Sequence, residues 1–76
     1  MQPGDLARVA HNFIVPVYNP NGVIALGYAK SGELVLVTKA EALGSGVARG
    51  YTEIIHPSIG LCLIERELLE VVNEAR

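Results

Sequence analysis

The 76-residue sequence contains no tryptophan, one cysteine, one methionine and one phenylalanine. The single cysteine, Cys62, cannot close an intrachain disulfide, and no run of metal-ligating residues accompanies it. The chain therefore lacks both a disulfide and a structural metal, the two cross-links that stabilise small extracellular domains. We expect the protein to reside in the reducing cytoplasm.

Positive charge is scarce as well. Six lysine and arginine residues stand against eight acidic residues, which gives a net charge of −2, and no window of the sequence clusters the basic residues. Proteins that follow a phosphate backbone need such a cluster. The sequence therefore predicts that nucleic acid is not a partner.

Long hydrophobic runs are also missing. Residues 1–5 have neither the basic region nor the apolar stretch of a signal peptide. The apolar runs elsewhere are far shorter than the roughly 20 residues that a membrane-spanning helix needs. We expect neither secretion nor a membrane partner.

The residues that are present favour one small folded domain over residues 1–76. Half of them are hydrophobic, and eight glycines and four prolines are spread among them. A chain this short buries only about 60% of the surface that its unfolded form exposes, so its core is thin. Self-association would add the stability that the core does not supply.

Turn-forming residues interrupt the chain at short intervals, and the runs between them are rich in Val, Ile, Leu and Tyr. This pattern predicts strands over residues 5–10, 23–29, 33–39, 51–56 and 61–64. The fold class is therefore all-β, a barrel of five to six short antiparallel strands. Residues 65–76 fit either a short helical turn or a closing strand, and we favour a turn followed by a strand.

Residues 23–29 and 33–39 form the best candidate hairpin, because the connection 30–32 places Gly32 where a positive φ is needed. Apolar residues fall on both faces of these two strands, and the rest of so short a chain cannot cover a second face. A partner subunit would cover it, so the sequence predicts a homo-oligomer.

Two segments of the sequence resemble the SH3-like barrel. The opening segment is Pro3-Gly4-Asp5-Leu6-Ala7-Arg8-Val9, and the closing segment is Glu67-Leu68-Leu69-Glu70-Val71-Val72 after the run Gly60 to Ile64. In such barrels these two patterns begin the first strand and end the last. Small stand-alone proteins of this kind are common in phages and mobile gene cassettes, so the resemblance implies that origin and an architecture that serves many activities.

Two functional groups of SH3-like proteins can be compared with this sequence. Type II dihydrofolate reductases carry Val-Gln-Ile-Tyr shortly after a His-Pro, whereas here His56-Pro57 leads to Leu61-Cys62-Leu63-Ile64. The loss of the glutamine and tyrosine argues against reductase chemistry. Peptide-binding SH3 domains bind polyproline on a groove of stacked aromatic residues that includes tryptophan. This sequence has three tyrosines and no tryptophan, so it has few residues with which to form that groove.

Residues capable of chemistry are scattered. His11 and His56 could meet Cys62 or Glu53 around a metal, but roles in loop hydrogen bonding and in a pre-proline turn are favoured. Cys62 lies in an apolar run, where a thiol behaves as a small core residue. The glycine-rich segment 44–50 lacks the Gly-Lys-Ser/Thr ending of a phosphate-binding loop. We therefore assign no catalytic, cofactor-binding or metal-binding residues.

The least ordinary segment lies where the long first loop of an SH3-like barrel is expected. It contains five large apolar residues: Phe13, Ile14, Val15, Val17 and Tyr18. Either the segment folds over the barrel end as part of the core, or it forms an interaction surface. We predict an interaction surface, for contact between subunits or with another protein.

The sequence thus favours a non-enzymatic binding or accessory protein that self-associates. Two alternatives remain open at this stage. One is a small enzyme whose site forms at the pore of a symmetric oligomer, as in type II dihydrofolate reductases. The other is a KOW-like nucleic-acid module, which the acidic net charge disfavours.

Overall fold

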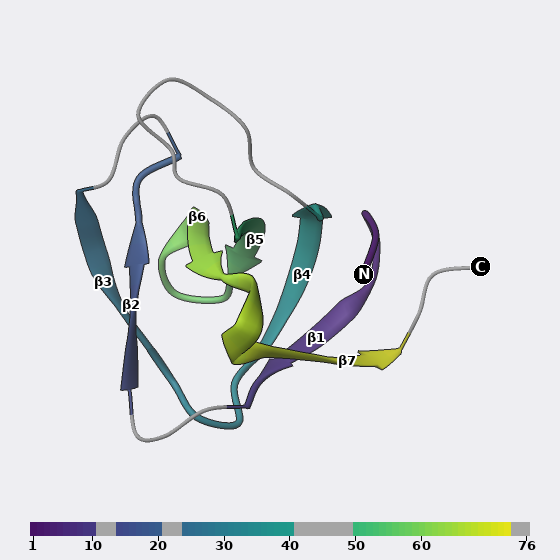
Figure 1. Ribbon diagram of the computed structural model, residues 1–76. Helices are drawn as coiled ribbons and strands as arrows, with labels where there is room; N and C mark the ends of the chain where they lie inside the picture. Colours follow the sequence, from purple (N-terminus) through teal and green to yellow (C-terminus); the bar gives the residue numbers. More distant parts are fainter. Residues whose placement is uncertain (11–13, 21–23, 41–49, 74–76) are drawn as a thin grey trace.

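A computed structural model of the chain describes residues 1–10, 14–20, 24–40 and 50–73. These residues form seven strands and one short 3-10 turn, drawn in Figure 1. In chain order they are β1 (Leu6–Val9), β2 (Ile14–Tyr18), β3 (Ala25–Lys30), β4 (Leu34–Lys39), β5 (Tyr51–His56), β6 (Gly60–Glu65), η1 (Arg66–Leu68) and β7 (Leu69–Asn73). The predicted all-β class is confirmed, and the number of strands exceeds the predicted five to six.

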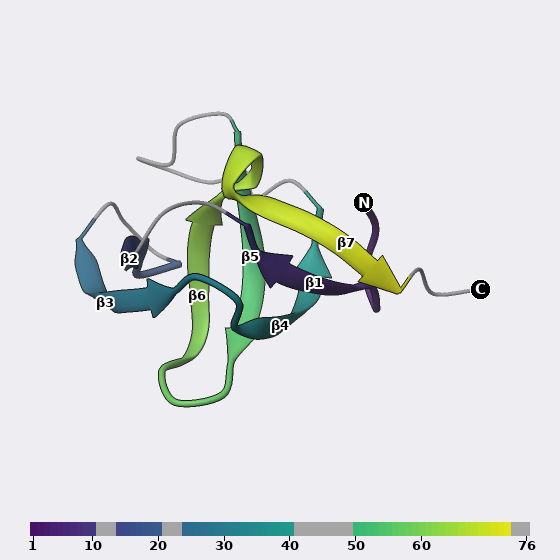
Figure 2. The same cartoon turned by 90° about the horizontal axis from the view of Figure 1, so that it is seen from below.

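The seven strands belong to one antiparallel sheet with the order β3-β2-β6-β5-β4-β1-β7. Figure 1 places the pair β2 and β3 on one side of β6 and β5, with β4 and β1 on the other side. In Figure 2, β1 and β7 run across the direction of β5 and β6, so the sheet curves round a central core. Its edge strands, β3 and β7, do not pair with each other, and the sheet formed by the described residues is therefore open.

The predicted hairpin between residues 23–29 and 33–39 is wrong. A tight turn does connect the two strands, with Gly32 at a φ of 91° and Glu33 N donating to Lys30 O over 3.1 Å. A positive φ at the third residue is typical of a type II turn, which splays the flanking strands apart. Gly32 N donates instead to Val9 O over 2.7 Å, and β4 pairs with β1 while β3 pairs with β2.

The additional strand is β2, in the segment that was expected to be a loop. It pairs with β3 along its whole length, from Ile14 opposite Lys30 to Tyr18 opposite Ala25. Pro16 has no N–H to donate, and β2 tolerates it because its ladder to β6 is the single pair Tyr18 opposite Leu63.

The favoured turn and strand at the end of the chain are confirmed. The 3-10 turn η1 is followed directly by β7, which pairs with β1 from Val9 opposite Leu69 to Leu6 opposite Asn73. Leu68 and Leu69 pack against the core while remaining partly exposed. In the described ranges η1 is the only helical element, and no helix there is long and apolar enough to cross a membrane.

The core is made of small and medium-sized apolar side chains contributed by six of the strands. Its members are Ala7, Val9, Val15, Val17, Ala29, Val35, Val37, Ile54, Cys62 and Ile64. Three polar residues are buried with them, and within the described residues every buried side-chain nitrogen or oxygen has a hydrogen-bond partner. Thr52 Oγ1 donates to Ala40 O over 2.9 Å, and Gln2 N donates to Asp5 Oδ2 over 2.8 Å. Among the described residues, the inner face of the sheet therefore buries polar side chains without leaving their nitrogen or oxygen atoms unpaired.

Candidate functional site

The outer face of the sheet carries a row of apolar side chains that are partly or largely exposed. In the antiparallel register Leu6 lies opposite Leu36, Leu36 opposite Ile55, and Ile55 opposite Leu61. Directly opposed residues project from the same face, so these four residues, called here the outer row, cross four adjacent strands. Leu36, Ile55 and Leu61 are 43%, 43% and 48% exposed.

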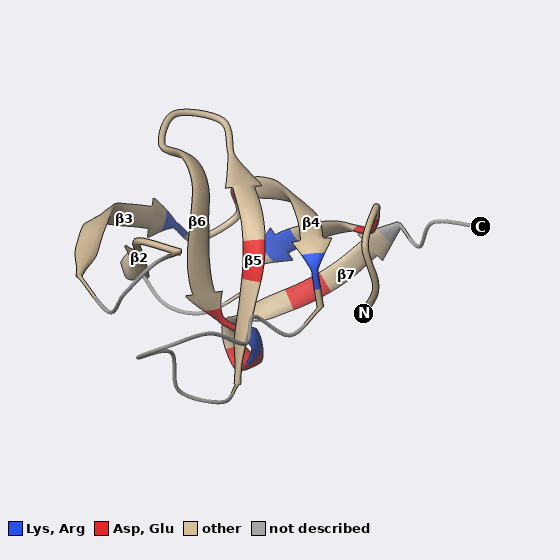
Figure 3. Ribbon diagram, turned by 90° about the horizontal axis from the view of Figure 1, so that it is seen from above, with Lys and Arg blue, Asp and Glu red and all other residues tan. Residues whose placement is uncertain are grey.

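Few charged residues lie on the part of the outer face that the row occupies. Figure 3 shows one acidic band on β5 and an acidic residue on β6 only at its C-terminal end, while the lysine and arginine colour on β1 and β4 lies beyond β5 from β6. An ion pair joins Arg8 of β1 and Glu70 of β7 over 2.7 Å, at the end of the row that Leu6 occupies. The outer row is therefore an apolar strip with a charged border, a pattern typical of contact surfaces.

The predicted interaction segment is divided between the two faces of β2. Val15 and Val17 are 4% and 0% exposed and belong to the core, which was the alternative weighed for this segment. Ile14 is 54% exposed, and Tyr18 is partly exposed on the opposite face to the two valines. Phe13 lies outside the described residues. The prediction of a contact surface therefore continues to apply to Ile14 and Tyr18.

The three tyrosines of the chain gather on the outer face. The rings of Tyr18 and Tyr51 have centroids 5.5 Å apart and planes 88° apart, an edge-to-face contact. The pKa of Tyr18 is raised above its ordinary value of 10.0, first by desolvation and then by Tyr51, Glu65 and Tyr28. The pairing of Tyr18 with Leu63 and of Pro16 with Tyr28 places Glu65 and Tyr28 each two residues from Tyr18 in the ladder. We call Tyr18, Tyr28 and Tyr51 the tyrosine cluster.

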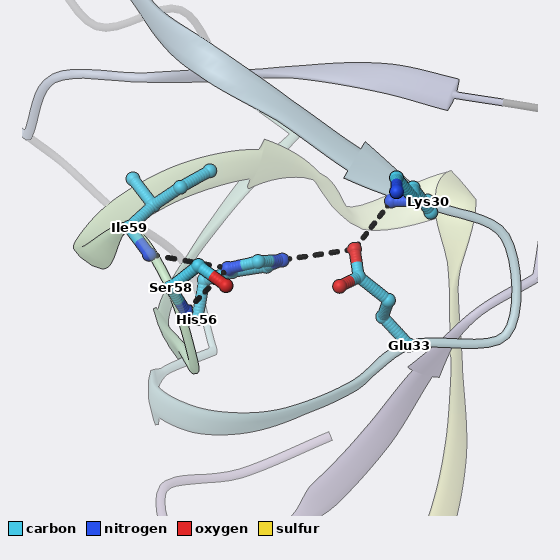
Figure 4. Close-up of polar contacts among 5 residues, drawn as sticks. All are labelled: Lys30, Glu33, His56, Ser58 and Ile59. Atoms are coloured by element: carbon cyan, nitrogen blue, oxygen red, sulfur yellow. Dashed lines mark hydrogen bonds and ion pairs between the residues drawn. The ribbon is translucent and has the colours of Figure 1, made fainter.

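His56 is buried at the turn between β5 and β6 and connects that turn to the turn between β3 and β4 (Figure 4). Its Nδ1 accepts hydrogen bonds from Ser58 N over 3.1 Å and Ile59 N over 3.3 Å. With Nδ1 acting as acceptor, the proton is on Nε2, which donates to Glu33 Oε1 over 2.9 Å. Both ring nitrogens are occupied, so His56 in this state has no nitrogen free to act as a base or to bind a metal. The predicted role in a pre-proline turn is confirmed.

Glu33 completes this connection. One of its carboxylate oxygens accepts from Lys30 N as well as from His56 Nε2. The hydrogen bond from the Lys30 backbone is the largest cause, and that from His56 the second, of a pKa for Glu33 below its ordinary value of 4.5. The ionised carboxylate is thus the form that holds the two turns together.

Cys62 has the properties of a core residue. It is 0% exposed, and burial raises the pKa of its thiol to about 11 although a backbone hydrogen bond at His56 opposes the shift. A nucleophilic cysteine needs a lowered pKa and an accessible sulfur, and Cys62 has neither. This confirms that it serves as a small core residue.

The remaining candidates for metal and phosphate binding do not assemble a described site. Within the ranges that the structure describes, no group of three or more His, Cys, Asp or Glu residues could hold a metal ion. His11 and residues 44–49 of the glycine-rich segment lie outside those ranges.

Comparisons with known proteins give no match: no protein-family model, no curated protein and no solved structure is similar to this chain. The outer row and the tyrosine cluster are thus the two surface features on which a function can be argued. Sequence periodicity could indicate that both faces of β4 are apolar, but the tyrosine cluster joins residues far apart in the chain and depends on the sheet order.

Proposed function

We propose that this protein is a small non-enzymatic binding module with an SH3-like arrangement of strands, which self-associates through its outer row. The observation that carries the proposal is the continuous apolar register from Leu6 through Leu36 and Ile55 to Leu61. Three strand spacings make the row about 14 Å long. None of its side chains can take up or donate a proton, so the surface suits association rather than chemistry.

The SH3-like arrangement is supported by where the two resembling segments lie. The opening segment forms β1, the closing segment forms η1 and β7, and the two strands are neighbours in the sheet. The meander of β4, β5 and β6 lies between them in the chain. The strand that the opening motif begins is thus paired with the strand that the closing motif ends, and we propose the barrel on that ground.

A second copy of the chain is the occupant that the outer row fits best. The row is uncharged and apolar along its length, so two copies related by a twofold axis can cover it without burying an unpaired charge. Completing the burial of a half-exposed leucine or isoleucine contributes about 1 kcal/mol. A thin core would gain stability from that association.

The test is light scattering after gel filtration, over a range of micromolar protein concentrations. We expect a mass of more than one chain for the unaltered protein and a single chain for the double variant Leu36→Ser with Ile55→Ser. The matched control is Leu26→Ser, since Leu26 is 46% exposed on edge strand β3, away from the row. A monomeric unaltered protein would overturn the proposal, and dissociation by the control variant alone would relocate the contact to β3.

A further inference from the structure

The tyrosine cluster and Glu65 lie on four adjacent strands, at the opposite end of the outer face from the outer row. Tyr28 lies opposite Pro16 in β2, two residues before Tyr18. Tyr18 lies opposite Leu63 in β6, and Tyr51 lies opposite Glu65. The order β3-β2-β6-β5 therefore brings three rings and one carboxylate together from distant parts of the sequence.

The distance between the two ends of this face follows from the strands that they share. Tyr51 and Ile55 are four residues apart in β5, as are Glu65 and Leu61 in β6. Four residues of strand span about 13 Å, and residues at even spacing project from the same face. Leu63, between the two ends, is only 2% exposed, so the two surfaces are separated by covered structure.

The chemistry of this end differs from that of the outer row. Tyrosine rings present an electron-rich face. The rings of Tyr18 and Tyr51 are nearly perpendicular, so their faces point in different directions. Tyr28 is 60% exposed and Glu65 is also exposed. The other carboxylate nearby on this face, that of Glu53, accepts a hydrogen bond from Thr38 Oγ1 over 2.8 Å. Among the described residues Glu65 takes part in no ion pair, so its charge is available at the edge of the cluster.

We infer that the tyrosine cluster and Glu65 together bind an arginine side chain presented by a partner protein. A guanidinium group is planar, stacks on an aromatic face and pairs with a carboxylate through parallel N–H donors. An open platform with one strongly exposed ring suits flat stacking, whereas a compact ammonium needs enclosure. The net charge of −2 adds a favourable long-range field for a basic segment.

The test is a titration of the isotopically labelled full chain with N-acetyl-arginine amide, followed by two-dimensional amide NMR. We expect shifts centred on residues 18, 28, 51 and 65, and no comparable shifts with N-acetyl-citrulline amide, which has the same shape without the charge. Tyr28→Leu and Glu65→Gln should each weaken binding at least threefold. Glu67→Gln is the matched control, because Glu67 is exposed in η1 and plays no part in the cluster.

Two results would overturn the inference: equal responses to arginine and citrulline, or unchanged affinity in Glu65→Gln. Well-dispersed amide spectra establish that each variant is folded, and Glu65→Gln keeps the test informative if Tyr28→Leu does not fold. The double variant Leu36→Ser with Ile55→Ser should bind arginine as the unaltered chain does. Failure of self-association and failure of arginine binding are therefore separate outcomes.

Discussion

Ile54 and Ile55 are neighbours in β5 with the same side chain and opposite surroundings. Ile54 is 0% exposed and lies within the core, whereas Ile55 is 43% exposed and lies in the outer row. The pleat alone produces this difference, because successive side chains of a strand point to opposite faces. The two side chains therefore have different roles. The Ile54 side chain stabilises the fold, whereas the Ile55 side chain is available to a partner.

The largest expected effect comes from shortening the inner of these two side chains. Ile54→Ala should lower the free energy of unfolding by about 3 kcal/mol, because it removes buried methylenes and leaves a cavity. Ile55→Ala at the same strand should cost well under about 1 kcal/mol in the dissociated chain. Urea unfolding at low protein concentration measures both.

In so small a domain the first variant can lose its fold altogether. Ile54→Val, with an expected cost of about 1 kcal/mol, then keeps the comparison measurable. Equal losses at the two positions would contradict the division between an inner and an outer face.

A smaller effect is expected at the turn that ends β5. His56→Ala should lower the free energy of unfolding by about 2 kcal/mol, because it leaves the N–H groups of Ser58 and Ile59 without their acceptor. Chemical unfolding monitored by circular dichroism measures the loss. His56→Asn keeps a hydrogen-bonding side chain and should recover part of the stability. An unchanged midpoint in His56→Ala would show that the two turns do not depend on this contact.

The smallest effect concerns the pH dependence of stability through Glu33. Its pKa is lowered in the folded chain, so the contribution of its carboxylate is complete above the unfolded value of about 4.5 and is lost as the pH falls through the folded value. Glu33→Gln should therefore flatten the decline of the melting temperature as the pH falls below about 4.5.

The amide of this variant can still accept from His56, which makes it a conservative replacement. A decline of the same slope in both chains would show that Glu33 does not contribute to acid unfolding.

Local sequence patterns predicted most of the strands, and non-local pairing explains what they missed. The runs that became β1, β4, β5 and β6 were recognisable because their apolar residues lie between strong turn signals. The segment that forms β2 is expected to be a loop because it lies where an SH3-like barrel has its long first loop. Its place beside β6 shows why a strand there accepts Pro16. Local pattern does not contain that information.

The predicted hairpin teaches the same lesson about turns. Gly32 correctly indicates a turn. A positive φ, however, occurs both in turns whose flanking strands pair as a hairpin and in turns whose flanking strands diverge. Here the turn parts the strands, and His56, from a strand far along the chain, binds it through Glu33, a contact that the local pattern does not contain. The tyrosine cluster could not be foreseen for a similar reason, because its members lie on strands whose adjacency is set by the sheet order.

The pairing of β1 has a consequence for how the chain acquires its structure. Both neighbours of β1, the strands β4 and β7, follow it in the sequence, and β7 is the last strand of the sheet. During synthesis on the ribosome the first strand emerges long before its second partner, so its backbone stays incompletely paired until the chain is nearly finished. Contacts of such large sequence separation slow folding, because the intervening loop must close before they form. The closing step of folding is therefore expected to be the docking of β7 beside β1, and a chain truncated before Leu69 would leave one edge of β1 open to pairing with other molecules.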